Sequence, residues 1–300
     1  MEKTLDEKII EKAAILIEAF PYIRAFRDKI IVVKYGGSTQ PEEGGSPTIM
    51  ADLVFMETVG MRPVVVHGGG KDISRRLEES DIESQWVNGL RVTDKASMQV
   101  VEDTLFGEVN RRIVDGLEIL DGRARGMSAK DAGVMYVTRH FATVEEEDGK
   151  SKEVDIGYVG DVARIDPEPI RLACEAGMIP VVSPIGLGPE GESYNVNADT
   201  AAGEIARALQ AEKLVFLTDV NGIRRFPDDP DSQISTLHVN DVEMLIERGI
   251  ASGGMIPKLR ACERSVKGGV HKTHIIDGSV PHALLLEIFT REGIGTQIVQ

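Results

Sequence analysis

Short apolar segments rich in β-branched residues alternate along this chain with segments of helical periodicity. The predicted strands are residues 30–35, 63–67, 133–140, 152–160, 179–183, 213–218, 272–276 and 296–299. The predicted helices between them are residues 48–60, 71–80, 94–108, 110–118, 167–177, 198–210, 240–248, 257–269 and 281–286. Apolar strands joined through helices are typical of a mostly parallel sheet with helices on both faces. The sequence therefore predicts an α/β fold, a three-layer αβα sandwich.

Residues 4–27 predict one extra helix, which precedes the first strand. Its apolar residues recur at helical spacing and form one stripe: Ile9, Ala13, Leu16, Ile17 and Phe20. Pro21 is expected to kink or break this helix, because proline lacks the N–H that a helical backbone uses. Since the helix lies before the alternating pattern, we expect it outside the main fold, either as a packing arm or as an oligomer contact.

The charge balance is strongly acidic. There are 49 acidic and 34 basic residues, which give a formal net charge of −15. Such a chain is not expected to bind nucleic acid or an acidic membrane surface, although a local cationic pocket for a small anion is compatible with it. Cys174 and Cys262 lack metal-ligand spacing and are interpreted as buried thiols. No run of 18 apolar residues and no signal peptide is recognisable, so we expect a cytoplasmic protein.

Two predicted strands end in glycine-rich segments. The first ends in "KYGG", residues 34–37, and the second in "HGGG", residues 67–70. In open α/β sheets, ligands bind beyond the carboxyl ends of the strands, and glycine lets backbone N–H groups approach an anion closely. Neither segment matches the P-loop or the dinucleotide-binding pattern. Each alone could be a tight turn, but both together, with Lys34 in the first, favour a phosphate site.

Polar side chains also occur at other bends and helix starts. Arg91 in "VNGLRVTD" follows a glycine-containing bend and could bind a carboxylate bidentately or form a surface ion pair. Asn195 and Asp199 in "NVNADTAAGEIARAL" lie where a helix begins, so Asp199 could also be a plain capping or first-turn acid.

The C-terminal half contains two comparable segments. "KLVFLTDVNGI" brings a strand to Thr218 and Asp219 before an Asn-Gly turn. "GGMIPKLRACERSV" could form an anion-binding bend at Gly254, with Lys258 early in the following helix. A simple turn and a solubilising lysine are the alternative interpretations.

In combination these segments resemble one enzyme family. The motifs "KYGG", "HGGG", "NGLRVTD", "NVNADTAA", "LTDVNGI", "GGMIPK" and "HALLLEIFTREGIGTQI" occur in the order found in the N-acetylglutamate kinases, which are part of the amino acid kinase family. "GMSAKDAG" and "DIGYVGDV" resemble the hairpin region of that family, and the resemblance extends over residues 29–300. It implies the amino acid kinase fold. It also implies transfer of the γ-phosphoryl group of ATP to the side-chain carboxylate of N-acetyl-L-glutamate, a step of arginine biosynthesis.

The resemblance implies a role for each matched residue. Lys34 and Lys258 would stabilise the transition state, and Asp199 would orient their ammonium groups. The substrate contacts would be Gly69, Gly70, Arg91 and Asn195. The nucleotide contacts would be Gly36, Gly37, Thr218, Asp219 and Gly254. Mg²⁺ is expected to arrive with ATP, so we predict no protein metal ligand and no tightly bound cofactor.

Regulation and assembly are also implied by the resemblance. Residues 1–28 would be the helix through which arginine-inhibited members interlace dimers into a homohexamer. Residues 29–300 would be the kinase domain, with a substrate lobe at 29–182 and a nucleotide lobe at 183–300. A site for the inhibitor L-arginine would include His274, Glu287 and the loop around Gly293.

Some positions depart from the family pattern. Ser38-Thr39-Gln40 replaces the frequent Asn-Ala-Met, and Lys71 adds a cation after the triple glycine, so both bear on acyl specificity. The alternatives are a sibling kinase acting on aspartate, glutamate, uridylate or carrier-linked aminoadipate, and a nucleotide-binding sensor without turnover. Arg91 and "NVNADTAA" favour acetylglutamate over the siblings. The pair of lysines favours turnover over sensing.

Overall fold

The computed structural model describes residues 5–36, 46–128, 132–145, 151–226, 229–290 and 293–300. Its centre is an eight-stranded sheet in which all neighbouring strands are parallel except β13 and β14. In spatial order the strands are β12 (Thr236–His238), β14 (Thr296–Val299), β13 (Lys272–Asp277), β11 (Lys213–Thr218), β1 (Ile30–Tyr35), β2 (Arg62–His67), β8 (Ile179–Val182) and β5 (Ala124–Met127). The predicted mostly parallel sheet is confirmed.

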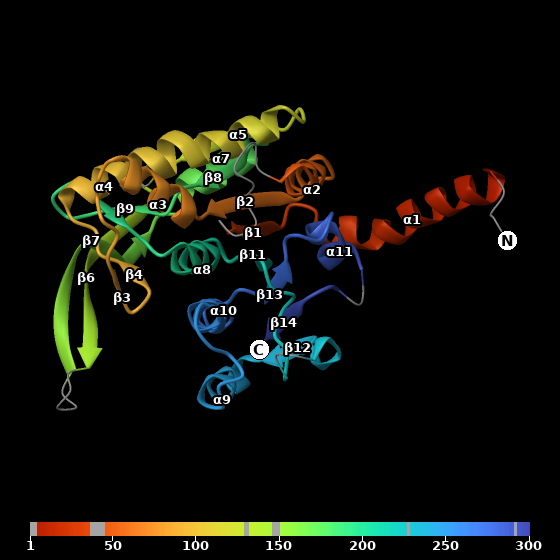
Figure 1. Cartoon of the computed structure of the whole chain (residues 1–300). Helices are drawn as coiled ribbons and strands as arrows, with labels where there is room; N and C mark the ends of the chain where they lie inside the picture. Colours follow the sequence, from red (N-terminus) through yellow and green to blue (C-terminus); the bar gives the residue numbers. More distant parts are fainter. Residues whose placement is uncertain (1–4, 37–45, 129–131, 146–150, 227–228, 291–292) are drawn as a thin grey trace.

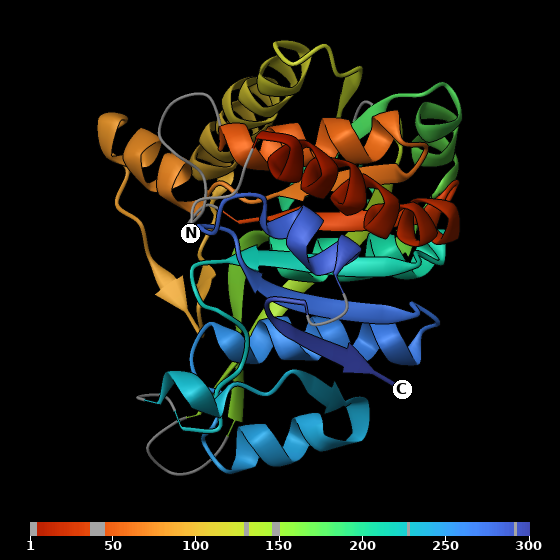
Figure 2. The ribbon, with the colours of Figure 1, turned by 90° about the vertical axis from the view of Figure 1, so that its right-hand side faces the viewer.

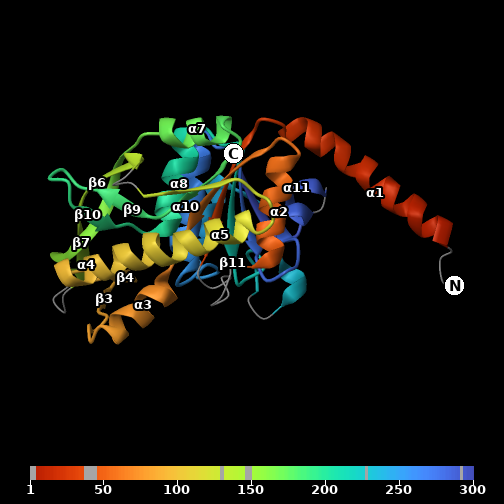
Figure 3. The ribbon, with the colours of Figure 1, turned by 90° about the horizontal axis from the view of Figure 1, so that it is seen from above.

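Helices cover both faces of this sheet (Figure 3). One face carries α7 (Glu168–Glu175), α8 (Ala198–Leu209) and α10 (Met255–Lys267). The other carries α2 (Pro47–Thr58), α5 (Arg111–Glu118) and α11 (Ala283–Phe289). Successive side chains of a strand point to opposite faces, so Val32 packs in the first core and Val33 in the second. Burial on both faces explains the continuous apolar strands of the sequence.

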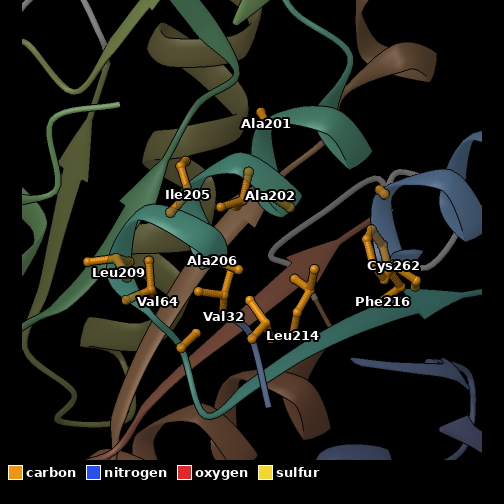
Figure 4. Packing of buried hydrophobic residues seen from close by; sticks show 14 of the residues in the cluster. Val32, Val64, Ala201, Ala202, Ile205, Ala206, Leu209, Leu214, Phe216 and Cys262 are labelled. Atoms are coloured by element: carbon orange, nitrogen blue, oxygen red, sulfur yellow. The ribbon is translucent and has the colours of Figure 1, made fainter. Parts of the chain in front are cut away.

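The first core is built from small helix residues packed against the strands. On α8, Ala202, Ile205 and Ala206 lie over Val32 of β1 and Leu214 of β11 (Figure 4). All five side chains are fully buried. Because alanines let the helix approach the sheet closely, α8 is held in one position, and its N-terminus lies near the carboxyl ends of the strands.

A smaller β unit extends from one end of the molecule (Figure 1). It is a closed arrangement of β6 (Met135–Glu145), β7 (Ser151–Ile165), β9 (Ile185–Leu187) and β10 (Ser193–Asn195). The antiparallel β6–β7 pair confirms the predicted hairpin, and its predicted acidic tip lies outside the described residues. A separate hairpin joins β3 (Trp86–Val87) to β4 (Leu90–Arg91).

The helices predicted at 94–108 and 110–118 form one continuous helical segment. It begins with α4 (Lys95–Glu102), continues as the π-helix η1 (Asp103–Asn110) and ends with α5. α3 (Gly70–Glu79) follows β2 directly. The C-terminal half also contains the 3₁₀ turns η2 (Pro230–Ser232) and η3 (Val239–Asp241) and the helix α9 (Val242–Glu247). α9 lies with β14 in the lower half of Figure 2.

The helix α1 (Leu5–Phe26) projects from the body (Figure 1) and points toward the viewer in Figure 2. Pro21 was predicted to kink or break the helix; a break is wrong, because the helix continues to Phe26. Proline removes one backbone hydrogen bond, and packing of the last turn compensates for it: the Tyr22 ring lies 6.4 Å from that of Phe289, and Phe26 packs in the second core. No described helix combines the length and apolar character needed to cross a bilayer.

Candidate active site

Two lysines from distant parts of the chain meet at one carboxylate. Lys34 Nζ lies 2.8 Å from Asp199 Oδ1, and Lys258 Nζ lies 3.0 Å from Asp199 Oδ2. The exposed fractions of the three side chains are 9% for Lys34, 18% for Lys258 and 7% for Asp199. β1 supplies Lys34, and the first turns of α8 and α10 supply the other two. One carboxylate therefore holds two ammonium groups side by side.

The geometry of α8 assigns Asp199 to this task and not to helix capping. The N-cap is Asn197, whose side-chain oxygen accepts hydrogen bonds from the backbone N–H groups of Asp199 and Thr200 at 3.0 Å each. Burial would raise the pKa of Asp199, but the charges of Lys34 and Lys258 outweigh burial and hold that pKa below its usual value. Asp199 is thus ionised at neutral pH and is unsuited to act as a general base.

A cleft of about 230 Å³ opens in front of this cluster. Its lining includes six of the residues for which the sequence predicted catalytic or substrate contacts: Lys34, Gly69, Gly70, Arg91, Asn195 and Asp199. These residues come from β1, the β2–α3 turn, β4, β10 and α8. Lys258 completes the group through its contact with Asp199. We call this space the first cleft.

Arg91 lies in the wall of the first cleft and is only 4% exposed. Its guanidinium donates hydrogen bonds to Ser84 Oγ, Ser74 Oγ and the carbonyl of Gly70, at 2.5, 2.7 and 3.2 Å. Burial lowers the pKa of Arg91, and among the described residues no carboxylate forms an ion pair with it. The surface ion pair considered from the sequence is therefore not formed there. A buried guanidinium held by neutral partners is available to an anionic ligand.

Backbone groups form another part of the wall. α3 begins at Gly70 without a side-chain cap, so the start of this helix presents backbone N–H groups and the positive end of its dipole. Asn195 Nδ2 lies 3.5 Å from Thr93 Oγ1, which anchors its amide at the same cleft. The cleft thus combines cationic side chains with N–H donors, which is an arrangement suited to a small anion.

A second cleft of about 420 Å³ lies beyond the ends of β11 and β13. Its lining includes Asp219, Ser252, Met255 and Asp277. Thr218 is buried just before it, where its hydroxyl donates to Asp219 Oδ1 at 3.1 Å, and Gly254 is the N-cap of α10. Of the four predicted nucleotide contacts that the structure describes, only Asp219 lines this cleft directly.

The other two predicted nucleotide contacts are Gly36 and Gly37. Gly36 is buried at the end of β1, next to Lys34, and does not line the second cleft. Gly37 and the Ser38-Thr39-Gln40 segment lie outside the described residues.

A third cleft of about 360 Å³ contains all three predicted effector residues, His274, Glu287 and Gly293. His274 Nδ1 donates to Glu287 Oε1 at 2.6 Å, and Lys213 Nζ lies 3.1 Å from His274 Nε2. Burial would raise the pKa of Glu287, but the contact with His274 lowers it overall, so Glu287 is anionic. Burial, followed by the charge of Lys272, lowers the pKa of Lys213 to about 8.

Sequence reasoning missed several residues of these clefts. Trp86 lines the first cleft and stacks on Arg91, with the guanidinium carbon 4.4 Å from the ring centre. Tyr22 and Phe26 of α1, with Lys213 and Lys272, line the third cleft. Trp86 precedes the matched "NGLRVTD" segment by two residues, and this proximity was an available signal. The lysines gave none, because charges at strand starts are common in any sheet.

The whole arrangement defines a phosphotransferase fold, and the comparisons assign its family. The model of the amino acid kinase family matches residues 29–277. The chain therefore belongs to the amino acid kinase family. It is 49% identical to the acetylglutamate kinase of Heliobacterium modesticaldum over 98% of this chain and 99% of that protein.

Solved structures show a similar fold. The fold resembles N-acetylglutamate synthase from Neisseria gonorrhoeae complexed with coenzyme A and N-acetyl-glutamate, with a TM-score of 0.81 and 28% identity. The match covers 96% of this chain and 63% of that longer chain. The same synthase complexed with coenzyme A and L-arginine matches with a TM-score of 0.75 and 28% identity, over 96% of this chain and 65% of the other.

Proposed function

We propose that this protein transfers the γ-phosphoryl group of ATP to the side-chain carboxylate of N-acetyl-L-glutamate and forms N-acetyl-L-glutamyl 5-phosphate. The Lys34–Asp199–Lys258 cluster at the first cleft carries this proposal. The acetylglutamate kinase of Heliobacterium modesticaldum, which aligns with this chain over nearly the full length of both proteins, supports it. So does a similar fold that was solved with N-acetyl-glutamate.

The chemistry needs cations more than it needs a base. A glutamate side chain has a pKa of about 4.3 and is already ionised at neutral pH, so no proton has to be removed. The difficulty is that this anion attacks a polyanion, and charge spreads over the oxygens of the transferring group. Lys34 and Lys258 neutralise that charge, while Asp199 keeps the two ammonium groups together against their mutual repulsion.

The first turn of α10 contributes one residue to the second cleft and one to the lysine–aspartate cluster at the first cleft. It carries Met255, which lines the second cleft, and Lys258, which contacts Asp199 in the first. The helix N-terminus also has no side-chain cap and adds its positive dipole end. We place ATP, which arrives with Mg²⁺ as a co-substrate, in the second cleft with its phosphates directed along this turn. The transferring phosphoryl group then passes between the clefts beside both lysines.

The two predicted lobes do not correspond one to one with the first and second clefts. The second cleft lies within the predicted nucleotide lobe, residues 183–300. Asn195 and Asp199 of that lobe also line the first cleft, together with residues of the predicted substrate lobe, 29–182. We therefore propose that the substrate is bound between the lobes, with α8 contributing to both sites.

Arg91 is proposed to bind the α-carboxylate of the acid. Replacing it by lysine is expected to raise KM for N-acetyl-L-glutamate by about tenfold to a hundredfold, because a bidentate, charge-assisted contact becomes a single one. kcat should change much less, since the contact is remote from the reacting carboxylate. Steady-state kinetics measures both values. Arg139→Lys on β6 is the matched control, because Arg139 pairs with Asp155 on the surface. An unchanged KM in Arg91→Lys would contradict the assignment.

The third cleft is proposed as an inhibitory site for L-arginine. Glu287 supplies an anion for the guanidinium, and Lys213 with Lys272 supplies cations for the carboxylate. Tyr22 and Phe26 close this cleft from α1, so a ligand there would also fix the position of the N-terminal helix. The similar synthase fold solved with L-arginine supports this proposal.

Replacing Glu287 by glutamine is expected to raise the L-arginine concentration for half-inhibition by at least about tenfold, because the charge of a buried carboxylate partner is lost. The measurement is the reaction rate as a function of L-arginine concentration at constant substrate concentrations. The rate of each variant is divided by its own rate without arginine. Glu79→Gln, at the exposed end of α3, is the control. Wild-type activity that is constant through millimolar arginine would contradict the regulatory proposal.

α1 is proposed as an oligomer contact. Four large apolar side chains on it are mostly exposed: Ile15 at 60%, Leu16 at 70%, Ile17 at 74% and Phe20 at 58%. An apolar stripe of this kind on a projecting helix is typical of an interaction surface. Together with the family resemblance, this stripe supports a homohexamer. The molar mass of the protein in solution measures the oligomeric state.

The experiment that tests the activity is a selectivity panel. ADP release with MgATP is followed for N-acetyl-L-glutamate, L-glutamate, L-aspartate and uridylate under the same conditions. The proposal expects kcat/KM to be highest for N-acetyl-L-glutamate. A higher value for another acceptor would assign a sibling activity, and no turnover with any acceptor would favour a sensor.

A further inference from the structure

His67 is a fully buried titratable residue that the proposed phosphoryl transfer does not use. It ends β2 immediately before the Gly68–Gly70 loop of the first cleft. Its Nδ1 lies 2.9 Å from the carbonyl oxygen of Gly68, and its Nε2 lies 3.1 Å from Asn110 Nδ2. The ring thus connects the loop to a residue far along the chain.

The partners determine which ring nitrogen carries the proton. Asn110 Nδ2 also lies 2.8 Å from the carbonyl oxygen of Val181, which can only accept, so this amide nitrogen donates to both neighbours. His67 Nε2 therefore accepts, and Nδ1 carries the hydrogen that is donated to the carbonyl of Gly68. Burial lowers the pKa of His67 to about 4, which agrees with a neutral ring.

The direction of the Gly68 carbonyl fixes the next N–H group. In a planar trans peptide, the carbonyl of one residue and the N–H of the next point in opposite directions. Because the carbonyl of Gly68 faces the buried ring of His67, the N–H of Gly69 points away from that ring, and Gly69 itself lines the first cleft. An anionic ligand in that cleft meets this donor.

The π-helix η1 supports the same loop at a second point. An ideal Cβ placed on Gly69 would lie 2.5 Å from Leu105 Cδ2, so Leu105 packs directly against Gly69. In an α-helix, residues five apart differ by about 140° around the axis, but the i→i+5 pattern of a π-helix brings them to one face. The wider helix therefore lets Leu105 and Asn110 contact the same loop.

We propose that His67, held by Asn110 of η1, is a positioning residue that directs the N–H of Gly69 toward the acyl substrate. Gly126 on β5 leaves the space for Asn110, because an ideal Cβ there would lie 2.3 Å from Asn110 Oδ1. This inference rests on the proposed function, since the ligand that meets the N–H is the acid substrate.

Two amide substitutions separate the contacts of the ring. The amide of His67→Asn lies close to the backbone and can replace the Nδ1 donor to Gly68. The amide of His67→Gln lies farther out and can replace only the Nε2 contact to Asn110. His67→Asn removes more buried volume than His67→Gln by one methylene, so the thermal stability of each variant is measured separately as the control for packing.

Steady-state kinetics with both substrates is the test. His67→Gln is expected to raise KM for N-acetyl-L-glutamate by about tenfold or more and to leave KM for ATP within about threefold, since a hydrogen bond to a charged ligand is misdirected. His67→Asn is expected to restore KM for the acid to within about threefold of wild type. A purely structural role would lower the thermal stability of both variants without this split.

The proposed function and the positioning role of His67 can be overturned by different results. If the wild type does not turn over N-acetyl-L-glutamate, the proposed function is wrong and this inference falls with it. If the wild type is active but the two variants share the same KM for the acid, or if KM for ATP rises equally, only the positioning role of His67 is overturned.

Discussion

Lys258→Ala is expected to lower kcat by at least about a hundredfold, while KM for either substrate changes by less than about tenfold. Lys258 extends from α10 and is held 3.0 Å from Asp199 Oδ2. In the proposed reaction, its charge faces the transferring phosphoryl group. Before transfer, that charge is only one of several that attract the phosphates. In the transition state, charge develops on the oxygens beside it, so its contribution is largest there.

The control lies on the same helix. Lys267→Ala removes an exposed ammonium whose partner is Glu263, near the other end of α10. It should leave kcat near the wild-type value, because the charge is outside the clefts. If Lys258→Ala retained the wild-type kcat, or if it lost only substrate affinity, Lys258 would not stabilise the transition state.

Asp199→Asn is expected to have a comparable effect on turnover and, in addition, a large effect on stability. The substitution preserves shape but leaves Lys34 and Lys258 as two neighbouring cations without their shared anion. Removing one partner from a buried ion pair costs about 3–5 kcal/mol, and the nearby cleft admits water, so we expect the lower end of that range. The melting temperature should fall by about 5 °C or more.

The pH dependence of stability gives a second measurement on Asp199→Asn. The pKa of Asp199 is lowered from its ordinary value of 3.8, because its two lysines outweigh burial. The stabilisation by its charge is therefore complete above the unfolded-state pKa and is lost as pH falls through the folded-state pKa. The difference in melting temperature between wild type and Asp199→Asn should shrink as the solution becomes strongly acidic. A difference that is independent of pH would contradict the electrostatic role.

The residues around the first cleft could be predicted because glycines and a lysine at the ends of apolar strands can be recognised in the sequence. Gly69 and Gly70 follow an apolar strand, and ligands of parallel sheets lie beyond the carboxyl ends of the strands. Lys34 ends a neighbouring strand at the same edge. The meeting of Lys34 with Lys258 could not be derived from spacing, because 224 positions separate them. Only the packing of α10 against α8, which itself lies over β1, brings their elements together.

Other structural features could not be predicted from the local sequence. The strands β3, β4, β9 and β10 have only two or three residues, too few to show a period of two. The π-helix η1 has ordinary helical composition, and its register depends on contacts such as that of Asn110 with His67. Likewise, Pro21 suggested a helix break, but packing of the final turn of α1 preserved the helix.

The most direct test of the account is trapping of the product. The full-length protein is incubated with MgATP, N-acetyl-L-glutamate and hydroxylamine, and the hydroxamate formed from an acyl phosphate is measured beside ADP. The account predicts hydroxamate and ADP in equal amounts, both dependent on N-acetyl-L-glutamate and strongly reduced in Lys258→Ala. ADP release without hydroxamate, or hydroxamate formed faster from another acid, would contradict phosphorylation of the N-acetyl-L-glutamate carboxylate.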